Sequence, residues 1–157
     1  MFLAEDIMTS PTKTIGKDTN VKEALNLLAD NNISGVPVTD ENGKLIGIIS
    51  GADIMRYSQQ KKMIPFSNTS LWVAPFGGSD EDLQVIRSGY ENLYRTLVDQ
   101  IMTKKVYSAA KDTPISELAQ LMNKHNINRI PIVDSDKKVI GIVTRNDLVK
   151  YMAGTES

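Results

Sequence analysis

The chain has 157 residues, a net charge of -1 and a pI near 5.8, so it lacks the basic surplus that attracts nucleic acid or anionic membranes. It contains no cysteine, which excludes disulfides, thiolate metal sites and cysteine nucleophiles. Residues 1–6 lack the basic and apolar regions of a signal peptide, and no apolar run has the length of a membrane span. We expect a soluble, cytoplasmic protein with no nucleic-acid or membrane partner.

A repeat organises most of the chain. Residues 6–57 align with residues 100–151 without a gap, and 18 of the 52 aligned positions are identical. The offset of 94 residues relates, for example, Asp53 to Asp147. Two unrelated stretches would not keep register over that length, so we infer an internal duplication.

Each copy is predicted to begin with a short lead-in and a helix. In the first copy, Asn20 and Glu23 have capping-box spacing, and an apolar stripe with helical periodicity follows. In the second copy, Pro114 occupies a position suited to the first turn of the equivalent helix. The two helices are expected to end near Asn31 and His125.

Two short strands and a second helix are predicted to complete each copy. The first strands, residues 36–38 and 130–133, each contain a proline, which favours an edge strand or the start of a strand. The second strands, residues 45–49 and 139–143, are almost wholly apolar, so both of their faces are expected to be buried. The second helices are predicted at about residues 52–62 and 146–152.

The segment between the copies is longer than a connector needs to be. Its first part, residues 63–78, contains Trp72 and two phenylalanines and is predicted to be a loop tied down by aromatic side chains. An amphipathic helix is predicted after it, with this apolar stripe: Leu83, Ile86, Tyr90, Leu93 and Leu97. We expect this helix to pack on the duplicated core or on a second subunit. The domain boundaries are therefore placed at residues 1–62 for the first repeat, 63–99 for the insert and 100–157 for the second repeat.

The junction between the second strand and the second helix carries the strongest functional signal. Ser50 and Asp53 in the first copy, and Thr144 and Asp147 in the second, have the spacing of a capping box. A helix N-terminus offers unpaired backbone N–H groups and a partial positive charge, so it can also receive an anion. From spacing alone the pairs are either helix caps or ligand contacts, and the cap is the simpler interpretation.

Taken together, these features resemble a tandem pair of CBS domains (named for cystathionine β-synthase), the arrangement called a Bateman module. The Ile-Met-Thr lead-in, the Asp-Thr before the first helix, the proline-centred strand and the Ser/Thr-x-x-Asp junction each occur twice in the same order. The resemblance implies an α/β (α+β) fold of two β-α-β-β-α repeats, related by a pseudo-twofold axis and packed through their sheets, with a loop and helix inserted between them.

The resemblance also implies a function. Related proteins act as regulatory modules that bind adenosine-containing ligands, so we expect AMP, ADP or ATP, or a related adenosyl metabolite, as the ligand and no required cofactor. Such modules commonly pair through their helices, which implies a homodimer. The signal would pass by conformational change to an effector protein that the sequence does not identify.

Two ligand clefts are implied, each drawing on both repeats. The first would contain Thr19, Arg129, Ile130, Pro131, Thr144 and Asp147. The second, expected to bind more weakly, would contain Thr113, Val36, Pro37, Ser50 and Asp53. A carboxylate can accept hydrogen bonds from a ribose diol, while a hydroxyl and a helix terminus can receive phosphate.

The two clefts differ in charge. Arg129 stands where phosphate-binding members of the family place a basic residue, and its fork of donors matches phosphate oxygens. Its counterpart in the first repeat is Gly35, and Arg145 likewise faces a glycine of that repeat. No nearby basic residue is expected at Asp53. We therefore expect a charged ligand in the cleft built on Asp147, and a weaker, empty or uncharged-ligand cleft in the other.

Catalysis has little support in the sequence. A Gly-rich phosphate loop, a nucleophile elbow and a zinc-ligand pair are all missing, so we expect neither an enzyme nor a metal site. His125, the only histidine, and the aromatic residues Trp72 and Phe76 are interpreted as structural. Two alternatives stay open: an interaction scaffold that binds no ligand and, less favoured, an enzyme whose chemistry lies in the insert.

Overall fold

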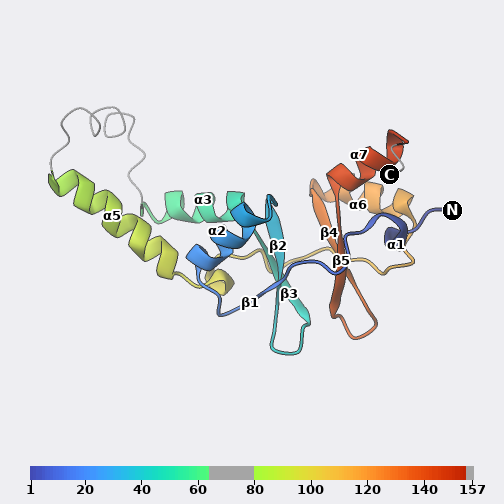
Figure 1. Cartoon of the computed structure of the whole chain (residues 1–157), viewed down its shortest axis with the longest axis horizontal. Helices are drawn as coiled ribbons and strands as arrows, with labels where there is room; N and C mark the ends of the chain where they lie inside the picture. The colour runs from blue at the N-terminus through green and yellow to red at the C-terminus, as the bar shows by residue number, and fades with distance from the viewer. Residues whose placement is uncertain (64–79, 155–157) are drawn as a thin grey trace. The chain divides into compact units, whose positions relative to one another are not determined.

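The structure, a computed structural model, describes residues 1–63 and 80–154 (Figure 1). In chain order its elements are α1 (Ala4–Ile7), β1 (Ile15–Gly16), α2 (Val21–Asp30), β2 (Gly35–Thr39), β3 (Leu45–Ser50), α3 (Gly51–Gln60), α5 (Asp80–Arg95), the 3-10 helix η1 (Val98–Gln100), α6 (Ile115–His125), β4 (Arg129–Val133), β5 (Val139–Thr144) and α7 (Arg145–Met152). No helix among these residues is both long and apolar enough to cross a membrane.

The chain forms two compact units, each assembled from separate stretches of sequence. The first unit contains Met1–Gly16, Pro37–Ile48 and Lys104–Ser157, and the second contains Lys17–Val36 and Ile49–Thr103. The first unit therefore holds α1 together with α6 and α7 of the second repeat, and the second unit holds α2 and α3 of the first repeat together with α5 and η1.

The first repeat has the predicted strand-helix-strand-strand-helix order, and in the second repeat a single bridge stands in place of the first strand. In the first repeat the sheet order is β1-β2-β3, and β1 runs parallel to β2 with Ile15 beside Val38. In the second repeat β4 and β5 are antiparallel, and Ala109 makes a single parallel bridge to Ile132. Ala109 and Ile132 are the counterparts of Ile15 and Val38 at the offset of 94 residues. The predicted fold class is confirmed.

In the first repeat proline does not mark a sheet edge, contrary to the sequence-based expectation. Pro37 lies inside β2, which is the central strand of its sheet, and the short strand β1 pairs only with the two residues after it. In the second repeat, the Ala109 amide donates to the Pro131 carbonyl at 3.1 Å, and the Ala109 carbonyl accepts from the Val133 amide at 2.9 Å. In this register the partner segment bonds to the proline carbonyl and to the amide two residues later, and it needs no N–H from the proline. A proline inside the strand is therefore tolerated on the side that faces Ala109.

A local pseudo-twofold relates the two hairpin turns of the first unit, which form an antiparallel bridge. The Leu45 amide donates to the Lys137 carbonyl at 3.0 Å, and the Val139 amide donates to the Gly43 carbonyl at 3.3 Å. At the offset of 94 residues Leu45 corresponds to Val139 and Gly43 corresponds to Lys137, so each of these hydrogen bonds is the counterpart of the other. The duplication in the sequence is therefore also a symmetry of the hydrogen bonding.

The segment before each repeat contacts the start of the first helix in the other repeat. In the first unit the Ala4 amide donates to the Thr113 carbonyl at 2.8 Å, and in the second unit the Val98 amide donates to the Thr19 carbonyl at 2.8 Å. Ala4 and Val98 are fully buried. The two threonines predicted to contact ligand are thus held in place through their backbones by α1 and η1.

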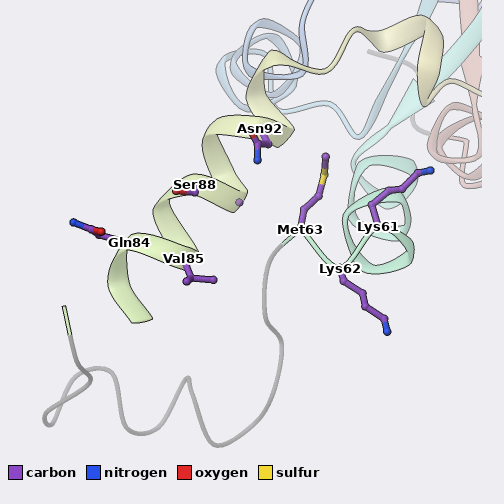
Figure 2. A pocket seen from close by; sticks show the side chains of 8 residues that line it. Lys61, Lys62, Met63, Gln84, Val85, Ser88 and Asn92 are labelled. Carbon is purple, nitrogen blue, oxygen red and sulfur yellow. The ribbon is translucent and has the colours of Figure 1, made fainter. Parts of the chain in front are cut away.

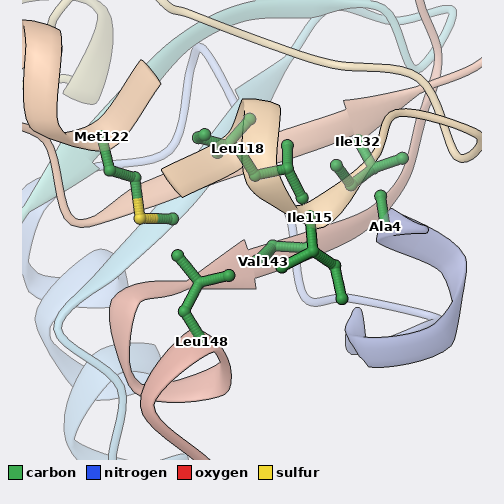
Figure 3. Packing of buried hydrophobic residues seen from close by; sticks show 8 residues of the cluster. Ala4, Ile115, Leu118, Met122, Ile132, Val143 and Leu148 are labelled. Atoms are coloured by element: carbon green, nitrogen blue, oxygen red, sulfur yellow. The ribbon is translucent and has the colours of Figure 1, made fainter. Parts of the chain in front are cut away.

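The two repeats bury side chains at equivalent positions. In the first unit the buried cluster consists of Ala4, Ile115, Leu118, Met122, Ile130, Ile132, Val143 and Leu148 (Figure 3). The counterparts at the repeat offset are all buried as well: Val98, Val21, Ala24, Leu28, Val36, Val38, Ile49 and Ile54. Each predicted apolar stripe of a first helix supplies three of these positions, while its fourth residue is half-buried in α2 (Leu25) and exposed in α6 (Ala119).

Helix ends follow the sequence signals with small shifts. Asn20 Oδ1 accepts from the Glu23 amide at 2.9 Å, which confirms the predicted cap of α2. Pro114 was predicted inside the first turn of α6 but is its N-cap, because its ψ of 144° is extended. The second helices each begin one residue earlier than predicted, at Gly51 and Arg145.

The second strands differ from each other in burial. In β5 the three residues 141–143 are buried, as expected of a strand covered on both faces. In β3 only Gly47 and Ile49 are buried, and the residues between and around them are half-buried. The expectation that both faces are buried is therefore wrong for β3 as it stands in a single chain.

The inserted helix packs on the duplicated core, which was one of the two expected arrangements. α5 packs against α2, and Leu93 is only 4% exposed. Tyr90, which the predicted stripe placed inward, is 39% exposed, whereas Gly89 is buried. The buried face is thus rotated by about one residue relative to the predicted stripe. The side chain of Leu83 and the predicted aromatic loop at residues 64–78 lie outside the described residues.

Candidate functional site

The junction of the second repeat forms both halves of a capping box at the start of α7. Thr144 Oγ1 accepts from the Asp147 amide at 3.2 Å, and the Thr144 amide donates to Asp147 Oδ2 at 2.8 Å. These bonds satisfy two of the N–H groups that a helix start leaves unpaired. Within the described residues, the other carboxylate oxygen, Asp147 Oδ1, accepts no hydrogen bond. One oxygen holds the helix and the other can receive donors from a ligand.

Arg129 lies directly across the β4–β5 ladder from Thr144. Side chains at opposed positions in an antiparallel ladder begin only about 5 Å apart, so the arginine stem starts beside the residue that caps α7. Ile130 and Pro131 follow Arg129 and are buried. The hairpin and α7 thus gather five of the six residues predicted for the first cleft in one unit, although 18 positions of sequence separate Arg129 from Asp147.

Thr19, the sixth residue, belongs to the second unit. It is half-buried, and its carbonyl is fixed by the Val98 amide just before α2. Its contribution to the first cleft stays a prediction.

The junction of the first repeat forms the same capping box but uses its carboxylate differently. The Ser50 amide donates to Asp53 Oδ2 at 3.0 Å, and the Asp53 amide donates to Ser50 Oγ at 3.2 Å. The second oxygen, Asp53 Oδ1, accepts from Arg56 Nη1 at 3.2 Å and from Thr103 Oγ1 at 3.5 Å. Both carboxylate oxygens of Asp53 therefore have partners within the protein.

The expectation that no basic residue lies near Asp53 is wrong. Arg56 lies three residues further along α3, and that spacing places both side chains on the same helix face. Asp53 is 12% exposed and Arg56 is 62% exposed, so water screens the pair on the arginine side. Such an ion pair stabilises a protein by about 1 kcal/mol at most, and a ligand can compete for it. The Asp-x-x-Arg spacing was the sequence signal for this contact.

Arg145, the second basic residue of the predicted asymmetry, makes hydrogen bonds within its own repeat. Its Nε donates to Asn128 Oδ1 at 3.0 Å, and its Nη2 donates to the Ile127 carbonyl at 3.3 Å. Its amide donates to the Asn128 carbonyl at 2.7 Å, a backbone contact that Gly51 and Ser34 repeat at 3.1 Å in the first repeat. Arg145 therefore ties the start of α7 to the loop before β4 through contacts within the second repeat.

The residues predicted for the second cleft are divided between the units. Thr113 and Pro37 belong to the first unit, while Val36, Ser50 and Asp53 belong to the second. Thr113 Oγ1 accepts from the Ala110 amide at 3.1 Å and so closes the turn before α6. The second cleft, like the contribution of Thr19 to the first, stays a prediction.

The only histidine stacks on an aromatic ring. The rings of His125 and Tyr107 have centroids 3.7 Å apart and planes inclined by 15°. This contact supports the structural interpretation of His125. In the part of the chain that the structure describes, no group of three or more His, Cys, Asp or Glu side chains could hold a metal ion.

A groove of about 760 Å³ lies between the end of α3 and α5 in the second unit (Figure 2). It is lined by Lys61, Lys62, Met63, Gln84, Val85, Ser88, Gly89 and Asn92. None of the predicted site residues is among them. Residues 64–79, which continue the chain from one wall of the groove to the other, lie outside the described part, so no function is assigned to this groove.

The fold and the two junctions define a class of protein. A duplicated β-α-β-β-α unit, hairpin turns related by a pseudo-twofold and a Ser/Thr–Asp capping box in each copy together describe a tandem pair of similar domains. The family model of the CBS domain matches residues 4–60 and again residues 98–154. The chain belongs to the CBS domain family and carries two such domains in tandem.

Its relatives include both stand-alone and larger proteins. The uncharacterized protein MJ1426 of Methanocaldococcus jannaschii is 35% identical over 156 residues, which cover 97% of this chain and 92% of that protein. L-aspartate semialdehyde sulfurtransferase of the same organism is 30% identical over 152 residues, but the match takes up only 23% of its length. The chain thus spans less than a quarter of that enzyme, and the likeness does not extend to the rest of it.

Two solved structures resemble almost the whole chain. The CBS domain pair of protein MJ0100, in complex with 5'-methylthioadenosine and S-adenosyl-L-methionine, has a TM-score of 0.74 and 28% identity, with 99% of each chain covered. CBSX2 in complex with AMP has a TM-score of 0.71 and 26% identity, with 98% of each chain covered. Adenosine-containing ligands therefore occur in CBS pairs of this fold.

Proposed function

We propose that the chain is a regulatory module that binds an adenine nucleotide (AMP, ADP or ATP) in a cleft built on Arg129, Thr144 and Asp147. The position of Arg129 opposite Thr144, which forms the capping box with Asp147, is the observation that carries this proposal. The complexes of related CBS pairs with AMP, 5'-methylthioadenosine and S-adenosyl-L-methionine support an adenosyl ligand. Ile130 and Pro131 would contribute apolar surface, and Thr19 would complete the cleft.

The three polar groups suit the parts of a nucleotide. Asp147 Oδ1 can accept hydrogen bonds from the two ribose hydroxyls while Oδ2 keeps its bond to the Thr144 amide. The guanidinium of Arg129 can donate two parallel hydrogen bonds to phosphate oxygens. The N-terminus of α7 adds a partial positive charge near the same place. A ligand that carries both a ribose diol and a phosphate would satisfy all three groups at once.

The cleft that contains Asp53 would bind more weakly. A ribose diol there must displace Arg56 from Asp53 Oδ1, whereas Asp147 Oδ1 has no such partner among the described residues. Arg56 also brings a positive charge to this junction. The weaker binding is therefore expected because both oxygens of the Asp53 carboxylate are occupied, and not because a basic side chain is missing.

Ligand binding would act on an equilibrium between conformations of the CBS pair. A ligand shifts such an equilibrium only by the ratio of its affinities for the two states. The effector protein that reads the shift, and the cytoplasmic location expected from the sequence, stay predictions.

A ligand screen tests this function. AMP, ADP and ATP at about 100 times the dissociation constant should stabilise the protein by about 2.7 kcal/mol, which corresponds to a rise in Tm of about 5–10 °C. Differential scanning fluorimetry followed by calorimetric titration measures both effects, with GMP as the control for nucleotide charge. Absence of stabilisation by any adenosine-containing ligand, including S-adenosyl-L-methionine, would favour a scaffold instead.

A second candidate function, a homodimeric interaction scaffold, is favoured by an apolar groove on the outer face of α6 and α7. The groove measures about 600 Å³, and its lining includes Phe2, Tyr151 and Met152. Met152 is 80% exposed, whereas its counterpart Ser58 is 2% exposed in the repeat against which α5 packs. The face that remains open in the second repeat would be covered by a second copy of the chain.

Charge placed in this groove should separate the subunits. Tyr151→Glu and Met152→Glu are expected to convert a dimer to a monomer, because a stable interface buries about 800 Å² per partner and tolerates no unpaired charge at its centre. Met55→Glu is the control, since Met55 is 57% exposed on α3 and lies outside the groove. Sedimentation velocity over a concentration series measures the change. A monomeric parent protein at about 100 μM, far above a nanomolar Kd, would contradict the dimer.

A further inference from the structure

The first unit contains a small polar pocket that none of the predicted cleft residues lines. It measures about 260 Å³ and lies where the lead-in of the second repeat meets the start of β3 and the turn between β4 and β5. Lys104, Ser108 and Lys137 supply its polar groups, and Val106 and Val133 supply apolar wall. The two lysines and the serine thus come from two segments that are distant in sequence, and the start of β3 completes the wall.

The positive charge of this pocket has no internal compensation. None of its lining residues is acidic. In the described part of the chain, neither Lys104 nor Lys137 makes an ion pair or a side-chain hydrogen bond. Asp134, the acid that begins the neighbouring turn, uses its Oδ1 to accept from the amides of Asp136 and Lys138, each at 2.9 Å. Two like charges that face one cavity repel each other, and a bound anion would remove that repulsion.

The backbone of Lys137 is strained. Its φ is +64°, in the left-handed region that side chains with a Cβ disfavour. The counterpart in the first repeat is Gly43, which makes the equivalent turn at a φ of +81° without that penalty. The counterpart of Lys104 is Ser10. Both lysines are therefore particular to the second repeat, and one of them is kept in a conformation that glycine would adopt more easily, which is a reason to seek a function for it.

We propose that this pocket binds a small phosphate dianion, held by the ammonium groups of Lys104 and Lys137 and by the hydroxyl of Ser108. Lysine binds phosphate as a compact point charge, and a hydroxyl adds a directed donor. The volume is below the roughly 300–1,000 Å³ of pockets that enclose drug-sized ligands, so the pocket suits a small anion better than a whole nucleotide. The ligand is inorganic phosphate or the phosphate group of a small monoester, bound apart from the proposed nucleotide cleft.

Calorimetric titration of the full chain tests the site. The parent protein is titrated with inorganic phosphate and with glycerol 3-phosphate, at constant ionic strength set with chloride. Lys104→Ser and Lys137→Gly exchange each lysine for the residue of the first repeat, and each should weaken binding by about tenfold or more, the loss expected when one charge-assisted hydrogen bond is removed. Lys138→Ser is the matched control, because it removes a lysine of the same turn that does not line the pocket. It should change the affinity by less than about twofold.

Each outcome decides the proposal. Binding of either anion, with the losses confined to the two pocket variants, supports it, and the preferred anion identifies the source of the phosphate. No binding of either anion by the parent protein overturns it, as does an equal loss in Lys138→Ser, which would show general attraction to a basic turn. An equal loss in Arg129→Gln would also overturn it, because the phosphate would then occupy the nucleotide cleft. The Tm of Lys137→Gly in chloride should equal or exceed that of the parent, which separates lost binding from lost folding.

Discussion

Asp147→Asn and Arg129→Gln are each expected to weaken AMP binding by about 10- to 100-fold. A hydrogen bond to a charged group contributes about 1.5–3 kcal/mol, and 1.4 kcal/mol corresponds to a factor of ten in affinity. Asparagine can still accept from the Thr144 amide, so Asp147→Asn removes the charge and keeps the cap of α7. Calorimetric titration of each variant with AMP measures the loss, and circular dichroism confirms that the helices remain.

Two further variants serve as controls for this result. Asp53→Asn is expected to lower the affinity of the stronger site by less than about threefold, because that site does not use Asp53 and additive effects are the rule for separate sites. Arg145→Gln removes a guanidinium close in sequence to the proposed cleft, but one already bound to Asn128 and Ile127. It should lower stability more than affinity. If Asp53→Asn abolishes AMP binding while Asp147→Asn does not, the two clefts have been assigned in the wrong order.

Gly141→Ala is expected to lower the free energy of unfolding by about 1–3 kcal/mol, the usual effect of an added methyl group in a packed interior. A Cβ on Gly141 would stand 2.7 Å from Met8 Sδ and 3.0 Å from the Thr9 carbonyl oxygen. The methionine can move, but the carbonyl cannot, because it accepts from the Ile142 amide at 3.1 Å while the Thr9 amide donates to the Ile142 carbonyl at 2.9 Å. The lead-in would have to leave β5 to make room.

Gly51→Ala is the matched control for this substitution. Gly51 begins α3, and no atom lies within 4 Å of a Cβ placed there. Alanine should leave stability unchanged or raise it by about 0.4–1 kcal/mol, because it restricts the unfolded chain without straining the helix. Urea denaturation followed by circular dichroism compares the two variants. Equal losses at both positions would show that the close approach at Gly141 relaxes without cost.

Most of the fold was predictable because the duplication makes each local sequence pattern occur twice. The caps and apolar stripes are local features, set by spacing along one helix, and the core positions of the two repeats coincide at the offset of 94 residues. The errors arose where a neighbour in space decides the outcome. Pro37 lies in a central strand because its neighbour β1 covers only the residues after it, and Tyr90 is exposed because α2 accepts a different face of α5.

The candidate site was predictable to a lesser degree. The Ser/Thr-x-x-Asp pairs followed from spacing, but the register of the β4–β5 hairpin that places Arg129 beside Thr144 was not predicted. The hydrogen-bond partners of the two carboxylates did not follow from the sequence. Asp53 meets Arg56 along its own helix and Thr103 from a segment 50 residues away, and only the first of these contacts has a spacing that the sequence displays.

The sequence by itself determined the duplicated architecture, the boundaries of the first and second helices of each repeat to within one or two residues, and the two junctions that carry a hydroxyl and an acid. These depend on interactions between residues a few positions apart, so periodicity and spacing reveal them. The tertiary structure alone decided which carboxylate oxygen is left for a ligand, that Arg145 is engaged by a loop while Arg129 faces Thr144, and that Lys104 and Lys137 line one pocket. Those features depend on side chains brought together from distant segments, and no pattern along the chain records which of them meet.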